Sequence, residues 1–258
     1  MREAGVDNQE ALKNTEIINN TINRLNKAGG GTLFFPSGDY LTASIHMKSN
    51  TTLELEAGAT LRFSDNFDDY MPFVEMRHEG VMMKSFQPLI YATDAENITI
   101  KGEGKLDGQG KAWWKEFFRV LIDLRDNGKR DINKYQPLFE QANDMKTLYA
   151  ETNVDWHSTL DRRFLRPPFI QPLRCRNVRI EGITIVNSPF WTVNPNFCDN
   201  VTVKGVTINN VPSPNTDGIN PESCSNVHIS DCHISVGDDC ITIKSCLLYT
   251  SPSPRDRG

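Results

Sequence analysis

Hydrophobic and polar residues alternate over short stretches along most of the chain. The stretches are rich in Val, Ile and Thr, and Gly, Asn or Pro residues interrupt them. A period of two is typical of strands with one buried face, and Gly, Asn and Pro mark the turns between strands. The pattern therefore predicts many short strands joined by tight turns.

Three of these stretches repeat one another. They share the pattern C-x-N-V-x-[IV]-x-[GD]-x-x-I and begin at Cys175, Cys198 and Cys224, 23 and 26 residues apart. Weaker copies begin at Ala95 and Ser49. A unit of this length cannot bury its own hydrophobic face, so successive units must stack on one another. The repeat predicts an all-β fold, a parallel β-helix with coils about 4.8 Å apart.

Equivalent positions of successive units are expected to form ladders through the stack. The ladders comprise Cys175, Cys198 and Cys224 on one line and Asn177, Asn200 and Asn226 on another. Buried thiols and amides that bond along the stack are the structural interpretation of both. Disulfide or metal roles are the alternative, although the sequence has no CxxC or paired Cys/His zinc spacing.

Two segments depart from the repeat. Residues 8–27 have helical hydrophobic spacing that ends at a Gly-rich stretch, which predicts a helix capping the open end of the β-helix. Residues 110–165 are charged and aromatic, and we expect a helical insertion there. Its aromatic cluster either stacks on a sugar ring or packs the helix against the coils. The cluster comprises Trp113, Trp114, Phe117 and Phe118.

The length and charge of the chain limit the number of domains and the kinds of partner that we expect. The 258 residues suffice for one sizeable domain, which we place at 1–245, with 246–258 as a non-native tail. The net charge of −5 indicates no basic surface of the kind that binds nucleic acid, so we expect no nucleic-acid partner. No run approaches 18 apolar residues, so no membrane span is expected, and the first residues lack the apolar core of a signal peptide. We expect a monomer.

Aligning the repeats brings acidic residues together. The segments "WTVNP" (191–195) and "DGINP" (217–221) both end three residues before a ladder cysteine, which pairs Val193 with Ile219. Placing Ile219 beside Ile241 on the following coil then sets Asp217 next to Asp239, with Asp238 one position earlier. Three carboxylates from two neighbouring coils are therefore expected to converge.

Such a cluster has a defined chemistry. Burial and mutual repulsion raise the pKa of at least one carboxyl group, which can then protonate a leaving group. An ionised neighbour can activate water, which is the two-carboxylate arrangement of glycoside hydrolysis. A solvated acidic turn and a calcium site are the alternatives. We predict that no metal or other cofactor is required.

The motifs resemble those of a known family. The segment "NTDGINPESCSNVHISDCHISVGDDCITIKS" is similar to the core of glycoside hydrolase family 28, the polygalacturonases and their relatives. The resemblance extends through "NSPFW" (187–191) and "LDGQG" (106–110) and covers about residues 10–245. It implies a right-handed parallel β-helix and hydrolysis of α-1,4-galacturonosyl bonds in pectin, an acidic plant polysaccharide. It also implies a parent protein that is secreted or periplasmic.

The resemblance assigns roles to individual residues. By motif, Asp238 is the general acid, whereas Asp217 and Asp239 position and deprotonate the attacking water, with inversion at the anomeric carbon. Asn215, the first residue of the N-T-D motif, is expected to help hold the site and its substrate. Lys244, which closely follows the aspartate pair, is a candidate substrate ligand.

Two further family motifs, G-H-G and R-I-K, do not occur in this chain. The segment from Cys246, "CLLYTSPSPRD", resembles a translated sequencing adapter, so we expect a C-terminally truncated fragment, and its activity is an open question at this point. The alternatives are a non-catalytic β-helix that binds acidic polysaccharide, a rhamnogalacturonan or xylogalacturonan hydrolase, and a calcium-dependent lyase.

Overall fold

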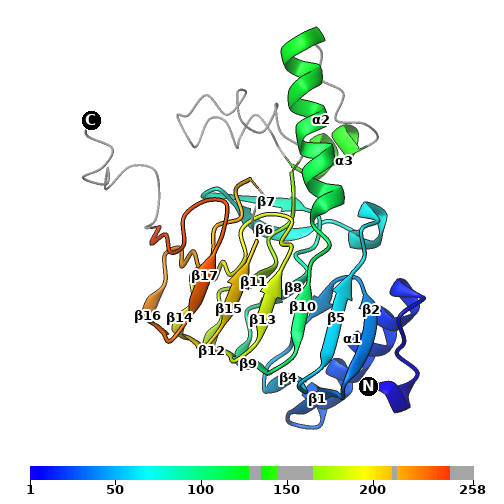
Figure 1. The fold of residues 1–258 in the computed structure, drawn as a ribbon. Helices are drawn as coiled ribbons and strands as arrows, with labels where there is room; N and C mark the ends of the chain where they lie inside the picture. Colours follow the sequence, from blue (N-terminus) through cyan, green and yellow to red (C-terminus); the bar gives the residue numbers. More distant parts are fainter. Residues whose placement is uncertain (128–134, 144–164, 211–213, 245–258) are drawn as a thin grey trace.

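The chain winds into stacked coils of parallel strands (Figure 1). The computed structural model describes residues 1–127, 135–143, 165–210 and 214–244. Equivalent strands of successive coils pair in parallel, and each coil contributes to three sheets that run along the stack. The parallel β-helix expected from the repeat, right-handed as the family resemblance implies, is therefore confirmed. The predicted tail, 246–258, lies outside the described residues.

Two six-stranded sheets form two faces of the stack. The first contains β1 (Gly31–Phe35), β4 (Thr51–Leu55), β9 (Glu96–Gly102), β12 (Arg176–Glu181), β14 (Asp199–Lys204) and β16 (Ser225–Ser230). The second contains β2 (Gly38–Thr42), β5 (Ala59–Phe63), β10 (Lys105–Asp107), β13 (Thr184–Val186), β15 (Thr207–Asn209) and β17 (His233–Ser235).

A third, narrower sheet forms the remaining face, which carries the predicted aspartates on its last coils. It contains β3 (Ile45–His46), β8 (Ile90–Thr93) and β11 (Ile170–Leu173). Single parallel bridges continue the same line through Val193, Ile219 and Ile241. This face therefore extends through the last described coil.

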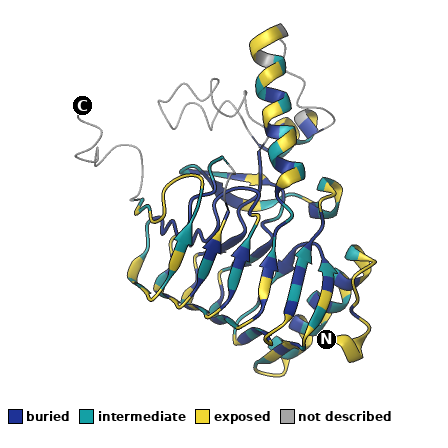
Figure 2. Ribbon diagram, viewed as in Figure 1, coloured by how far each residue is buried: buried dark blue, intermediate teal, exposed yellow. Residues whose placement is uncertain are grey.

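The core lies inside the coils, where the inward positions of every strand meet (Figure 2). In the first sheet, Leu53, Ile100, Ile180 and Val203 are paired in register from coil to coil, and all four are buried. Each such side chain contributes about 1.5–3 kcal/mol through the hydrophobic effect. The alternation of hydrophobic and polar residues thus fixes which face of each strand turns inward.

An N-terminal helix, α1 (Ala11–Lys27), covers the first coils as predicted. Its Ile18 and Ile22 side chains are fully buried against the coils. Its amides also satisfy backbone carbonyls of the underlying coils: Asn19 Nδ2 donates to Ser44 O at 3.0 Å and Asn26 Nδ2 to Ser49 O at 2.9 Å. The helix therefore caps both the hydrophobic interior and the polar edge, which would otherwise stay open to pairing.

Other helices and strands project from the coils. The predicted insertion contains α2 (Lys111–Asn127) and α3 (Gln136–Ala142), while 128–134 and 144–164 lie outside the described residues. The sequence did not predict an antiparallel hairpin, β6 (Val74–His78) and β7 (Val81–Ser85), which contacts β11 on the third face. Short 3-10 helices occupy Arg2–Ala4 and Phe67–Tyr70.

The asparagine ladder joins successive coils on the outside of the turns. Asn97 Nδ2 donates to Asn50 Oδ1 at 2.7 Å, Asn177 Nδ2 to Asn97 Oδ1 at 2.8 Å, and Asn200 Nδ2 to Asn177 Oδ1 at 2.7 Å. Their φ angles are all between 57° and 62°, the left-handed region that asparagine tolerates. The predicted ladder is confirmed up to Asn200, but Asn226 donates instead to Asp199 Oδ1.

The cysteine ladder is also structural. The backbone N–H of Cys175 donates to Cys198 Sγ at 3.4 Å, and the N–H of Cys198 donates to Cys224 Sγ at 3.4 Å. All three thiols are free. The thiol groups therefore serve as acceptors along the stack.

We expect Asn177→Ala to lower the free energy of unfolding more than Asn177→Gly. Both variants lose the amide bonds to Asn97 and Asn200, worth about 0.5–1.5 kcal/mol each. Only alanine is strained at a φ of 57°, by about 1–2 kcal/mol. Urea unfolding of the two variants separates these effects, and equal midpoints would show that the left-handed backbone carries no penalty here.

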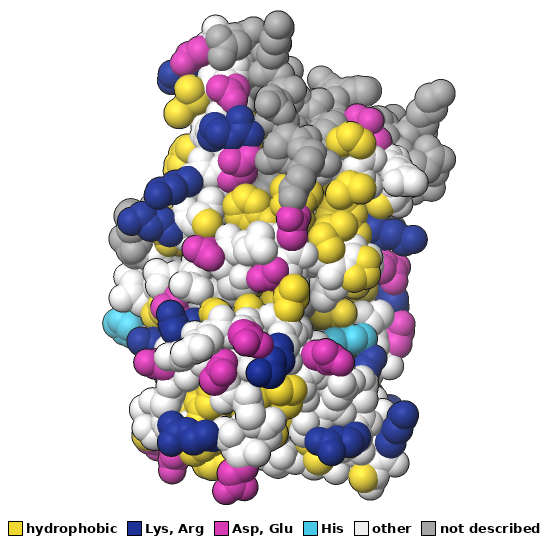
Figure 3. Space-filling model, turned by 90° about the vertical axis from the view of Figure 1, so that its right-hand side faces the viewer, with side chains coloured by type: hydrophobic (Ala, Val, Ile, Leu, Met, Phe, Trp, Pro, Cys, Tyr) yellow, Lys and Arg dark blue, Asp and Glu magenta, His cyan; other side chains and the backbone are white. Residues whose placement is uncertain are grey.

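Charges of both signs are interspersed over the face drawn in Figure 3. Several of the described pairs bridge neighbouring coils, including Arg176 with Glu96 and Lys101 with Glu54. Such exposed pairs contribute at most about 1 kcal/mol each. Within the described part of the chain, none of the helices has the length and apolar character that crossing a membrane requires.

Candidate active site

The three predicted carboxylates converge at the last described coils. Val193 bridges Ile219, and Ile219 bridges Ile241, which is the register expected from the repeat. Carboxylate oxygens of Asp217, Asp238 and Asp239 all lie within 4.8 Å of one another. The structure thus brings Asp217 beside an aspartate pair that lies more than 20 positions later in the sequence.

Gly218 allows the two coils to approach. Its N–H donates to the carbonyl oxygen of Asp239 at 2.9 Å, which ties the coil of Asp217 to that of the aspartate pair. A Cβ atom at this position would lie 2.6 Å from Ile234 Cγ2 and closer still to the carbonyl oxygen of Cys240. The glycine of the N-T-D-G motif is therefore required by the close packing of backbone against backbone.

Asp217 is the buried member of the cluster, with 4% of its surface exposed. Its Oδ2 accepts a hydrogen bond from Asn220 Nδ2 at 2.9 Å and lies 3.8 Å from Lys244 Nζ. Burial raises the pKa of Asp217 above its ordinary value, and the negative charge of Asp238 adds to the rise, while Asn220 and Lys244 oppose it. Its protonation thus depends on a balance between burial and two specific partners.

Asp238 and Asp239 are exposed, in contrast to Asp217. Asp238 Oδ1 accepts from the backbone N–H of Asp239 at 3.0 Å, and its Oδ2 lies 3.5 Å from Asn215 Nδ2. Asp239 Oδ2 accepts from Thr242 Oγ1 at 3.2 Å. The cluster therefore combines one buried carboxyl group with two that face solvent.

Sequence reasoning missed Arg166, which holds the predicted site residue Asn215. The guanidinium donates to Asn215 Oδ1 at 2.9 Å and to the carbonyl oxygens of Pro189 and Pro214. Arg166 is buried and stacks over the ring of Phe117, 4.0 Å from its centroid. The sequence offered no signal for it beyond its place at the resumption of the coil after the insertion.

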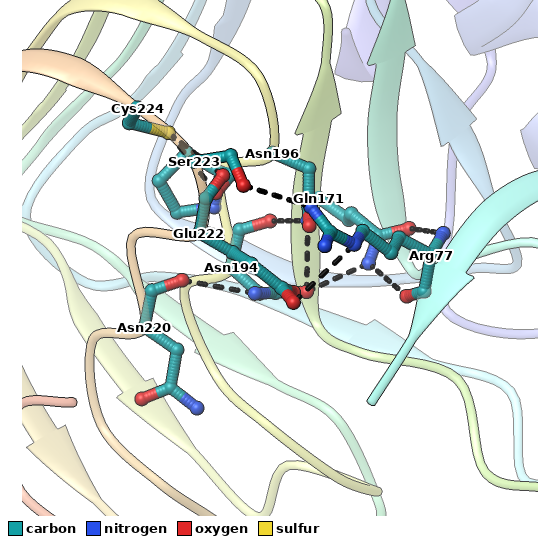
Figure 4. A network of polar contacts seen from close by, with 9 residues as sticks. Arg77, Gln171, Asn194, Asn196, Asn220, Glu222, Ser223 and Cys224 are labelled. Atoms are coloured by element: carbon teal, nitrogen blue, oxygen red, sulfur yellow. Dashed lines mark hydrogen bonds and ion pairs between the residues drawn. The ribbon is translucent and has the colours of Figure 1, made fainter. Parts of the chain in front are cut away.

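Asn220 was also missed, and a buried amide network fixes it (Figure 4). Gln171 Nε2 donates to Asn194 Oδ1 at 2.7 Å, and Asn194 Nδ2 donates to the carbonyl oxygen of Asn220 at 2.9 Å. The three residues occupy one line of the third face. Their repetition at equivalent positions was a signal that the alignment of the coils could have supplied.

Lys244 lies against the ring of Trp191, with Nζ 4.3 Å from the ring centroid, and its ammonium faces Asp217. Its role as a substrate ligand remains a prediction. The aromatic cluster of the insertion mainly packs: Trp113 is fully buried beside Phe67 and Tyr70, and Phe117 is buried, whereas Phe118 is exposed.

The arrangement suits proton transfer better than cation binding. Calcium takes six to eight oxygen ligands, and the three aspartates could supply some of them. The ammonium of Lys244, however, lies 3.8 Å from one of these carboxylates and would repel a divalent cation. A buried acid next to two exposed acids can hold and move protons at a bond placed between them.

Comparison with known proteins agrees with the fold and the motifs. The sequence profile described as "Glycosyl hydrolases family 28" matches residues 153–248. A "Probable polygalacturonase" from Vitis vinifera is 30% identical over 250 residues, which are 93% of this chain and 43% of that protein. The crystal structure of a hyperthermoactive exopolygalacturonase from Thermotoga maritima superposes with a TM-score of 0.75 at 34% identity, covering 95% of this chain and 53% of that one.

A polygalacturonase from Erwinia carotovora ssp. carotovora shares the fold, with a TM-score of 0.64 at 22% identity and coverage of 93% and 56%. The fold and the site define a parallel β-helix protein with a carboxylate cluster on its narrow face. Residues 153–248 match glycosyl hydrolase family 28, as the motifs indicated, and the similar proteins named above are polygalacturonases. It spans less than half the length of the curated relatives it matches first.

Proposed function

We propose that this chain carries the acid–base centre of a hydrolase that cleaves α-1,4-galacturonosyl bonds of pectin. The observation that supports the proposal is the convergence of Asp217 with Asp238 and Asp239 from neighbouring coils. The matched relatives named polygalacturonases favour the same substrate class. We further propose that the protein acts outside the cytoplasm, where plant polysaccharide is found, and needs no cofactor.

The role of each carboxylate follows the family resemblance. Asp238 is exposed and able to reach a glycosidic oxygen, so we assign it as the general acid. Asp217 and Asp239, on neighbouring coils, deprotonate and position the attacking water. Asn215, held by Arg166, keeps Asp238 oriented and is placed to contact the substrate.

The stereochemical outcome is a separate question, because the carboxylate oxygens approach within 4.8 Å. Inverting glycosidases usually separate acid and base by about 6.5–9.5 Å, and retaining enzymes by about 5–5.5 Å. Single displacement with inversion nevertheless follows from the family resemblance. We therefore propose inversion. The attacking water binds to Asp217 and Asp239, and it does not lie between the carboxylate oxygens that approach one another most closely.

The test is incubation with polygalacturonate, followed by reducing-sugar release and by proton NMR of the first product formed. We expect new reducing ends of the β-anomer, because inversion converts the α-linkage, and no loss of rate with chelator. An α-anomer would overturn the proposed inversion. An ultraviolet-absorbing product lost with chelator would indicate a lyase, and binding without product would indicate a non-catalytic β-helix. Rhamnogalacturonan and xylogalacturonan in parallel reactions test the substrate class.

A further inference from the structure

A series of alternating charges leads from the β6–β7 hairpin to Asp217. Arg77 of β6 pairs with Glu222, whose Oε1 lies 3.3 Å from Arg77 Nε, and both side chains are buried (Figure 4). The backbone of Lys244 forms a parallel β-bridge with that of Glu222, so the two residues are neighbours on successive coils. Lys244 Nζ in turn lies 3.8 Å from Asp217 Oδ2. Positive and negative side chains thus alternate in the order Arg77, Glu222, Lys244, Asp217.

Arg77 is buried, and several contacts hold its side chain in place. It donates from Nη1 to Ser223 Oγ at 3.1 Å, and its guanidinium lies 4.5 Å from the centroid of the Phe197 ring. Its backbone carbonyl accepts from Gln171 Nε2 at 2.8 Å, which anchors the hairpin to the third face. Glu222 therefore has Arg77 as its close cationic partner, and the charge of Lys244 on the neighbouring coil acts on it at longer range.

Lys244 lies between the Asp217 carboxylate and the face of an aromatic ring, in register with Glu222 of the neighbouring coil. Trp191 lies 4.3 Å below the ammonium and is itself stacked on Phe190, with ring centroids 5.0 Å apart. Only about a quarter of the Lys244 side chain is exposed. A cation in this position interacts with Asp217 and Glu222 through a medium that screens charge less than water does.

A base must be ionised in order to take a proton, and burial opposes the ionisation of Asp217. We propose that Lys244 is a positioning residue that keeps Asp217 ionised, and that Glu222 limits this effect by competing for the same ammonium. The inference rests on the proposed role of Asp217 as a base. The contacts of Lys244 on which the inference is based do not depend on which substrate is cleaved.

The test measures the protonation of Asp217 directly, without substrate. Carbon-13 NMR titration of Asp-labelled protein reports each carboxyl group, and Asp217→Asn identifies the signal. We expect Lys244→Met to raise the pKa of Asp217 by at least about 1, because it removes the nearby opposite charge. Lys244→Arg keeps the charge and should leave that pKa close to its original value. Lys101→Met, at an exposed pair with Glu54, is the matched control.

A second variant has the opposite expected sign. Glu222→Gln should lower the pKa of Asp217, because it removes a negative charge and leaves Lys244 with one carboxylate partner. Circular dichroism checks that the variant retains the β-helix fold. The proposal is overturned if Lys244→Met leaves the pKa of Asp217 unchanged, or if Glu222→Gln raises it. The titrations need no substrate, so they test the effect of Lys244 on Asp217 whether or not the chain hydrolyses polygalacturonate. The proposal on Lys244 and the proposed hydrolase function can therefore be refuted independently.

Discussion

Asp238→Asn is expected to reduce polygalacturonate hydrolysis by about two to four orders of magnitude. General acid catalysis contributes roughly this factor, and an amide cannot donate the proton that the leaving oxygen requires. The substitution keeps an oxygen that can accept from the backbone N–H of Asp239. Because Asp238 is exposed, the fold should be unaffected. The measurement is the initial rate of reducing-sugar release at saturating substrate.

Asp231→Asn is the matched control for this prediction. Asp231 is exposed in the turn before β17, with a φ of 56° that asparagine adopts equally well. It lies outside the carboxylate cluster. Full turnover in Asp231→Asn with loss in Asp238→Asn supports the assignment. Unchanged turnover in Asp238→Asn would instead require another group to protonate the leaving oxygen.

The repeat made the backbone of the site predictable. In a stack of coils, two residues at equivalent positions lie one strand spacing apart, whatever their separation in sequence. The ladder cysteines therefore aligned Val193 with Ile219, and the same register set Asp217 beside Asp239. The capping helix was predictable for a similar reason, since its hydrophobic spacing needs a surface such as the open end of the coils.

The surroundings of the carboxylates were not predictable in the same way. The β6–β7 hairpin has no counterpart in the repeat, so nothing in the sequence placed Arg77 against Glu222. Arg166 approaches Asn215 from the end of the insertion, where the coil alignment gives no register. Periodicity thus specified which aspartates meet, whereas Arg77 and Arg166 reach the site from segments outside the repeat.

Gly218→Ala is expected to impair both stability and activity, because the glycine lies where the two site-bearing coils are closest. The added methyl group would overlap the Cys240 carbonyl and approach Ile234 Cγ2 to 2.6 Å. Overpacking of this kind costs about 1–3 kcal/mol. The coils can relieve it only by separating, which weakens the bond from Gly218 N to Asp239 O and moves Asp217 away from Asp239. A displacement of about 1 Å can lower turnover about a hundredfold.

Gly205→Ala distinguishes this steric effect from a general intolerance of alanine. Gly205 has a φ of 64°, so alanine is strained there by about 1–2 kcal/mol, but the nearest atom to an added Cβ lies 3.9 Å away. Urea unfolding should therefore show losses of similar size for both variants, while only Gly218→Ala loses turnover. If Gly218→Ala remains as stable and as active as the original protein, close contact between these coils does not position the aspartates. If both variants lose turnover equally, stability rather than the spacing of the coils controls the site.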